Sequence, residues 1–347
     1  MNKILELLKS ETVEVIGCTE PAAIAYSFAL VKKFFPETKI SIKNVKARLT
    51  ASKEILRNAD TAGIPRLNAR GLKAVSAMGI FSENPQFNIF SKITKMQLAN
   101  VKEILARRNW FEFKVLNKNS FYIKSELMIG DTIFESIIQD KHNNLISFKK
   151  NGKIIFQEKP FKQITLKGIQ EIYDISEMRD NEIEKFAESI LNTNGSLYDK
   201  LKIFDVSEAV AQLIEQRMSG AFLSICTFTG SGNQGIFLSL PFYKLYKQFG
   251  RNVLPAFVFT LLMQIYLKQQ SGLLSHLCGL SEKASPALAA GFLFLKNRKL
   301  SEIEKAIISI LETTRGLCCE GAKESCADKG FMCMHNVIRK YGQGMNL

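Results

Sequence analysis

The sequence has little histidine and tryptophan, three residues and one among 347, and it has no long uninterrupted apolar run. Its most apolar stretch, residues 253–267, is shorter than the roughly 20 residues that span a bilayer, and Pro255 and Gln264 interrupt it. We therefore expect a buried core helix there and no membrane association. Residues 1–9 have an amphipathic pattern without the apolar core and cleavage site of a secretion signal, which predicts a cytoplasmic protein.

Arginine-rich blocks are also missing. The net charge of +14 comes mainly from lysines scattered along the chain, and no series of aromatic residues alternates with basic ones. Nucleic-acid-binding proteins usually concentrate such residues on one surface, so we expect no nucleic-acid partner. A scattered basic surface attracts anionic small molecules only weakly.

Cysteine is the residue type with an unusual distribution. The chain has seven cysteines, an odd number, and four of them lie between positions 318 and 333. Without a secretion signal this count argues against a disulfide framework and favours metal binding or catalysis. The close cysteine pairs and histidine partners of zinc sites are missing, whereas irregularly spaced thiolates suit an iron–sulfur cluster. Packing of these cysteines in a core is the competing interpretation.

Cys319 and Cys326 are seven residues apart, which on a continuous helix would separate them by about 10 Å along the axis. Two ligands of one compact cluster must lie closer together. Shared ligation therefore requires a bend between them, and Gly321 provides a position where the chain can turn.

The pattern of apolar residues predicts an α+β fold. Residues 1–35 are expected to form N-terminal helices of a mostly helical domain, with a break at 16–21, and this domain resumes over 165–347. Residues 36–164 form an inserted α+β module of short strands. Strands are predicted at residues 38–49, 111–115, 120–128, 132–139, 145–149 and 153–157. Helices are predicted at residues 93–106, 182–192, 207–218, 235–249, 253–269, 286–295 and 301–314.

Two loops that precede helices have features of reactive sites. Cys18 stands just before a helix for which Thr19 or Glu20 can act as N-cap, so the helix dipole is expected to lower its pKa and favour a nucleophile or general base. A small apolar residue under the helix start is the alternative. Glycines at 218–220 and 230–235 offer backbone N–H groups to an anion, or form an ordinary turn.

Three motifs occur in order along the chain: Gly-Cys-Thr-Glu-Pro-Ala-Ala at 17–23, Gly-Asn-Gln-Gly-Ile at 232–236, and Cys-Glu-Gly-Ala-Lys with Ser-Cys-Ala at 319–327. With this order and spacing the sequence resembles the iron–sulfur L-cysteine desulfidases. That family is related to the alpha chain of bacterial iron–sulfur L-serine dehydratase. The resemblance extends along nearly the whole chain.

The resemblance implies a 4Fe-4S cluster held by Cys278, Cys319 and Cys326. Three thiolates leave one iron without a protein ligand, and by analogy with aconitase-like dehydratases this iron would act as a Lewis acid on the substrate. The implied reaction is β-elimination from L-cysteine to hydrogen sulfide, pyruvate and ammonia, with Cys18 as the base. A small amino acid is thus the expected partner, and a homo-oligomer is compatible with the sequence. The substrate-binding residues assigned with this family are Thr19, Glu20, Asn58, His142, Ser219 and Asn233.

Several segments depart from the family pattern. The usual Ser-Gly-Asn and Ile-Pro-Gly-Thr are replaced at 52–54 and 64–67, and the small residues that usually follow Cys278 are replaced at 280–286. The cluster motif is therefore better kept than the substrate pocket. L-Serine dehydration and a cluster-binding paralogue or sensor without turnover are the alternatives. A pyridoxal-phosphate lyase would need a Schiff-base lysine, which no motif indicates.

Overall fold

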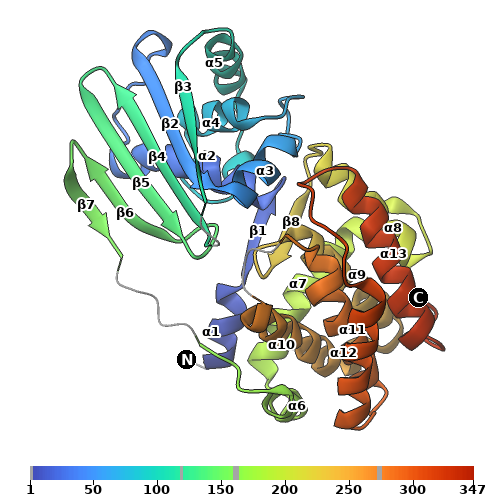
Figure 1. Ribbon diagram of the computed structural model, residues 1–347. Helices are drawn as coiled ribbons and strands as arrows, with labels where there is room; N and C mark the ends of the chain where they lie inside the picture. The colour runs from blue at the N-terminus through green and yellow to red at the C-terminus, as the bar shows by residue number, and fades with distance from the viewer. Residues whose placement is uncertain (1–2, 118–119, 159–163, 272–275) are drawn as a thin grey trace.

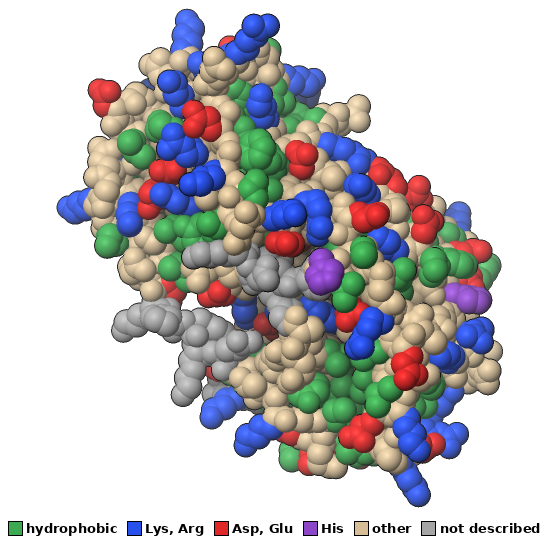
Figure 2. Space-filling view, viewed as in Figure 1, with side chains coloured by type: hydrophobic (Ala, Val, Ile, Leu, Met, Phe, Trp, Pro, Cys, Tyr) green, Lys and Arg blue, Asp and Glu red, His purple; other side chains and the backbone are tan. Residues whose placement is uncertain are grey.

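The computed structural model describes residues 3–117, 120–158, 164–271 and 276–347. An α+β module with a six-stranded sheet packs beside a helical domain, and a two-stranded ribbon lies where the two parts meet (Figure 1). The predicted α+β class is confirmed. On the face shown in Figure 2, basic side chains are scattered among acidic ones and form no single patch.

The sheet of the module has the strand order β3-β2-β4-β5-β6-β7. Strands β2 and β3 run parallel and all other neighbours are antiparallel. The strands are β2 (Val45–Ser52), β3 (Phe111–Leu116), β4 (Tyr122–Ile129), β5 (Thr132–Gln139), β6 (Leu145–Lys150) and β7 (Lys153–Gln157). Each overlaps a predicted strand, although β2 begins later than predicted because Ile42–Asn44 form a 3-10 turn.

Helix α2 (Thr19–Phe34) covers one face of this sheet. The backbone oxygen of Ser27 accepts hydrogen bonds from Ser125 on β4, at 3.1 Å, and from Ser136 on β5, at 2.9 Å. These bonds satisfy polar groups inside an otherwise apolar layer. The other helices of the module are α3 (Lys53–Thr61), α4 (Leu72–Ile80) and α5 (Lys95–Leu105).

The helical domain is built around α9, α10 and α11, whose phenylalanine rings pack together in its core. Its other helices surround them. The helices are α6 (Ile169–Glu177), α7 (Asn181–Leu201), α8 (Val206–Met218), α9 (Gly232–Phe249), α10 (Leu254–Ser271), α11 (Ser285–Leu295), α12 (Leu300–Thr314) and α13 (Ser325–Tyr341). The expected core helix corresponds to α10, and the prediction is confirmed.

Segment Gly232–Ser271, which contains α9 and α10, is long and apolar enough to cross a membrane by length and composition alone. Its most apolar window is 67% buried inside the protein. A core helix of a soluble protein has this degree of burial, because its apolar side chains pack against other helices.

The N-terminal segment differs from the prediction. Residues 1–35 were expected to be helical, but strand β1 (Thr12–Ile16) separates α1 (Lys3–Ser10) from α2 and pairs with β8 (Ser224–Phe228). Helix α1 packs in the helical domain, whereas α2 is buried in the core of the α+β module. The β-branched residues of β1 favour a strand over the helical continuation of α1.

Three contacts hold the two parts together around one cavity. Gly63 packs directly on the backbone of Ser219, and its N–H donates to the Met218 oxygen at 2.8 Å. The ion pair between Arg70 and Glu324 fastens the C-terminal segment to the module. Buried Glu11 forms ion pairs with Lys141 of the module at 3.1 Å and with Lys268 of α10 at 2.5 Å.

Candidate functional site

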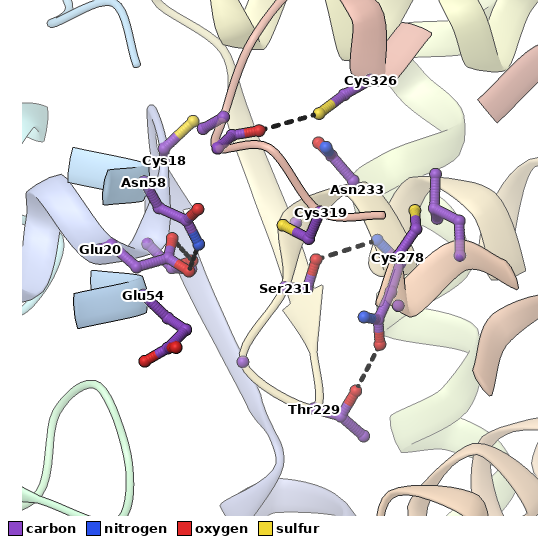
Figure 3. Close-up of a pocket in the computed structure, with 18 of the residues that line it drawn as sticks. Cys18, Glu20, Glu54, Asn58, Thr229, Ser231, Asn233, Cys278, Cys319 and Cys326 are labelled. Atoms are coloured by element: carbon purple, nitrogen blue, oxygen red, sulfur yellow. Dashed lines mark hydrogen bonds between the residues drawn. The ribbon is translucent and has the colours of Figure 1, made fainter. Parts of the chain in front are cut away.

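A cavity of about 160 Å³ lies between the module and the helical domain. Since one water needs roughly 10–15 Å³ on this measure, the cavity has room for a small molecule. The turn from β1 to α2 and the helix α3 line one side (Figure 3). The opposite side is lined by the start of α9, the segment around Cys278 and the C-terminal segment that precedes α13.

Three cysteines, which we call the cysteine triad, face this cavity: Cys278, Cys319 and Cys326. The first two are brought together by an antiparallel bridge between Leu277 and Cys318. In this bridge the Cys278 N–H donates to the Leu317 oxygen at 2.7 Å, and the Cys319 N–H donates to the His276 oxygen at 2.7 Å. Residues 41 positions apart in the chain thus become neighbours.

Between Cys319 and Cys326 the chain bends, which is the geometry that the hypothesis of shared ligation requires. Gly321 has a φ of +111°, a conformation that favours glycine, and a Cβ there would contact Thr61 of α3. Cys326 lies in the first turn of α13, where its thiol donates to the Gly321 oxygen at 3.5 Å. The bend therefore brings both thiols of the segment to one cavity.

The triad thiols influence one another electrostatically. Burial raises the pKa of Cys278 and of Cys326, and the nearby Cys319 raises both further. Within the described ranges, no group of three or more His, Cys, Asp and Glu side chains lies close enough together to hold a single metal ion.

Cys18 also lines the cavity, in the turn between β1 and α2. Gly17 has a φ of +78°, and a Cβ there would press on Pro65, so the turn requires glycine. Cys18 itself, and not Thr19 or Glu20, is the N-cap of α2. The expected low thiol pKa is wrong: burial raises the pKa of Cys18 to about 11, although the charge of Arg217 opposes this shift. Desolvation by burial is the largest cause of this shift.

Glu20, on the same side of the cavity, is surrounded by polar side chains that stabilise its negative charge. Its carboxylate accepts hydrogen bonds from Thr19 and from Asn58, each at 2.9 Å, and His142 Nε2 lies 3.9 Å away. Burial alone would raise the pKa of Glu20, but these neighbours lower it to about 2. Glu20 is therefore ionised at neutral pH. His142 is itself buried, and it comes from the turn between β5 and β6.

The glycine-rich segment 230–235 forms the start of α9, and Asn233 lines the cavity there. The Ser231 hydroxyl caps the helix by accepting from the Gln234 N–H. Gln234 packs closely against Gly279, where a Cβ would overlap its side chain, and accepts a hydrogen bond from Thr229 at 2.9 Å. The start of α9 is thus fitted to the segment that carries Cys278.

Ser219 lies outside the cavity. Its side chain is exposed and donates to the Gln216 oxygen at 2.9 Å. The 218–220 segment packs on Gly63 and joins the two parts of the protein. Met218 of this segment lines the cavity, whereas Ser219 and Gly220 do not. Of the ten residues predicted for catalysis, substrate binding and the cluster, the other nine all line the cavity.

The sequence indicated none of the four lysine and arginine side chains that line the cavity, Arg57, Arg217, Lys268 and Lys283, of which Arg217 and Lys283 are buried. Arg217, the last but one residue of α8, is 2% exposed and reaches both Gly17 and Asn233. Lys283 follows Cys278 by five positions, and burial, together with the charge of Lys268, lowers its pKa to about 8. The cavity therefore contains a buried lysine, although no sequence motif indicated one. Neither residue stands in a motif, so only its burial in the folded protein distinguishes it.

The similarity to known proteins covers most of the chain. Residues 86–346 match the family model described as "Serine dehydratase alpha chain". A "UPF0597 protein" of Thermosipho africanus is 27% identical over 94% of this chain and 85% of that protein. Another from Clostridium perfringens is 29% identical over 94% of this chain and 83% of that protein.

A "UPF0597 protein" of Elusimicrobium minutum aligns with the full chain at 27% identity and 89% of its own length. The family match includes the cysteine triad, Arg217 and Asn233, and it begins after Cys18, Glu20 and Asn58. The resemblance indicated by the sequence motifs is thus confirmed at the level of the family. The chain belongs to the serine dehydratase alpha chain family.

Proposed function

We propose that this protein is an iron–sulfur-dependent lyase that catalyses β-elimination on a small amino acid, with L-cysteine as substrate. Membership in the serine dehydratase alpha chain family indicates a lyase. The observation that carries the finer proposal is that the cysteine triad faces, across one small cavity, the Cys18 thiol and the ionised Glu20. Thiolates for a cluster and groups for proton transfer and substrate binding thus share one space.

The cysteine triad would hold a 4Fe-4S cluster, which when bound supplies a Lewis acid for the leaving sulfur. Its three thiols provide a soft donor set, and in the described part of the chain none of them is in a disulfide. The protein groups across the cavity act on the rest of the substrate. Glu20, kept ionised by His142, Asn58 and Thr19, offers a negative charge to the substrate's ammonium group.

Cys18 is proposed as the base that takes the α-proton. The electron pair of the Cα–H bond then forms the Cα–Cβ double bond, and the pair of the Cβ–S bond leaves with the sulfide. Water converts the resulting aminoacrylate to pyruvate and ammonia. With a pKa of about 11, the Cys18 thiol is protonated near pH 7, so this role requires that activity increase with pH.

The test is purification without oxygen, followed by an absorption spectrum, iron analysis, and assays for sulfide and pyruvate from L-cysteine. We expect a brown protein that releases sulfide and pyruvate in equal amounts. A colourless, iron-free protein would contradict the cluster. A brown protein that forms pyruvate from L-serine, and no sulfide from L-cysteine, would indicate a dehydratase instead.

A cluster without turnover of either amino acid would indicate a cluster-binding paralogue. A second candidate activity, pyridoxal-phosphate-dependent elimination, gains one observation from the buried Lys283 in the cavity wall. Reduction of the purified protein with borohydride distinguishes it, because a Schiff base to Lys283 would become a stable adduct detectable by mass spectrometry. We expect no such adduct.

A further inference from the structure

Arg217 places a buried positive charge in the cavity wall. Its guanidinium donates to the Gly17 oxygen at 2.9 Å and to the side-chain oxygen of Asn233. Both acceptors are neutral, and Nε has no hydrogen-bond partner. Across the parts of the chain that the structure describes, no carboxylate forms an ion pair with Arg217. A buried charge without a counter-ion is costly, which favours binding of an anion beside it.

Cys18 does not supply that anion. Its thiol lies close to Arg217, with Sγ 4.0 Å from the Arg217 backbone oxygen. Burial keeps the pKa of this thiol at about 11, so the sulfur is neutral at physiological pH. A bound anion can therefore serve as the counter-ion of Arg217.

The start of α9 reinforces this anion site. The Ser231 hydroxyl accepts a hydrogen bond from the N–H of Gln234. The N–H groups of Gly232 and Asn233 have no partners inside the 18-residue helix. Both residues line the cavity. Because Gly232 has no Cβ, the Arg217 guanidinium can lie directly against the helix start. One cation and two backbone donors thus meet at one end of the cavity.

Glu20 provides the opposite charge on the same cavity. Thr19 and Asn58 occupy one acceptor position on each of its oxygens, and a carboxylate can accept further hydrogen bonds. His142 Nε2 lies 3.9 Å from the same carboxylate, beyond hydrogen-bond distance, and forms an ion pair with it when the imidazole is protonated. A positively charged group of a ligand can therefore bind here.

We propose that Arg217 and the start of α9 bind the carboxylate of a zwitterionic α-amino acid, while Glu20 binds its ammonium group. This assignment rests on the proposed amino-acid chemistry and specifies the orientation of the substrate. The α-carbon, which carries both groups, then lies at Cys18, whose chain neighbours are Gly17 and Thr19. The β-carbon and its leaving group point toward the cysteine triad on the other side of the cavity (Figure 3).

The test measures binding by isothermal titration calorimetry to protein purified without oxygen. Propionate is L-alanine without its ammonium group, ethylamine is L-alanine without its carboxylate, and none of the three has a leaving group. We expect L-alanine to bind at least tenfold more tightly than either of the others. Arg217→Gln should weaken L-alanine at least tenfold and leave ethylamine unchanged, while Glu20→Gln should weaken L-alanine and leave propionate unchanged.

Arg339→Gln, on the exposed surface of α13, is the matched control and should bind all three ligands normally. If Arg217→Gln does not fold, Gly232→Ala tests the same site, because the added Cβ displaces the guanidinium but keeps its charge. Unchanged affinity for L-alanine in a folded Arg217 or Gly232 variant would overturn the proposal. Failure of L-alanine to bind the unmodified protein would overturn it as well.

The outcome is separable from that of the proposed lyase activity. If the ligand pattern holds but no sulfide or pyruvate forms, the amino-acid site stands and the lyase proposal fails. If L-cysteine is turned over but the charge-deleting variants bind all ligands as before, the assignment of Arg217 and Glu20 fails alone.

Discussion

Replacing Glu20 with glutamine removes the most strongly perturbed carboxylate of the cavity. In the folded protein its pKa is lowered from 4.5 to about 2, which corresponds to about 3 kcal/mol of stabilisation at neutral pH. Glutamine keeps an oxygen that can accept from Asn58, so about 3 kcal/mol is the upper limit of the loss. We expect Glu20→Gln to lower the free energy of unfolding at pH 7 by up to this amount.

The pH dependence gives this prediction its specific signature. Since the pKa is lower in the folded state, the stabilisation is complete above pH 4.5 and is lost as the pH falls toward 2. The difference in the free energy of unfolding between the original protein and Glu20→Gln, measured by urea unfolding, should therefore be largest at pH 6–7. This difference should be smaller at pH 4 and smaller still at pH 3.

Glu54→Gln is the matched control. Glu54 lines the same cavity, but within the described residues its side chain has neither a hydrogen bond nor an ion pair. Its replacement should change the free energy of unfolding by less than about 0.5 kcal/mol. The reasoning would be refuted if Glu20→Gln were as stable as the original protein at pH 7, or if the gap between them did not depend on pH.

Three further predictions concern the cysteines and the segment that holds them. Serine in place of any member of the cysteine triad should greatly lower the iron content after anaerobic purification, whereas Cys318→Ser, exposed and outside the cavity, should retain it. Cys18→Ala should keep the iron and lose turnover, and kcat/KM of the original protein should rise about tenfold per pH unit from pH 7 to 9, because the Cys18 pKa is about 11. Gly279→Ala should cost roughly 1–3 kcal/mol of stability in thermal unfolding and also lower the iron content, because the new Cβ would overlap Gln234.

Local sequence patterns were sufficient for most of the secondary structure. Alternating residues identified β4 to β7 nearly to their ends, and helical periodicity identified α7 to α12. The patterns failed at β1, a five-residue strand that exists because it pairs with β8 more than 200 positions later. Short strands depend on such distant partners, which a local window does not contain.

Some features of the site could likewise be identified from the sequence, whereas others depend on the tertiary structure. The motifs and the family resemblance identified nine cavity residues, but their convergence depends on the bridge between Leu277 and Cys318 and on the packing of Gly63 against Ser219. Ser219 was assigned to the site with the family resemblance, and the fold places it outside the cavity. Arg217 was missed because nothing in its sequence context shows that its charge is buried.

The protonation state of Cys18 shows most clearly what only the tertiary structure decided. Its position before a helix, visible in the sequence, predicted a low pKa through the helix dipole. The fold buries the thiol beneath the end of α8, and the loss of water around the sulfur raises the pKa to about 11. Sequence alone determined which residues can react, whereas burial and neighbouring charges, set by contacts distant in the chain, determined their charge.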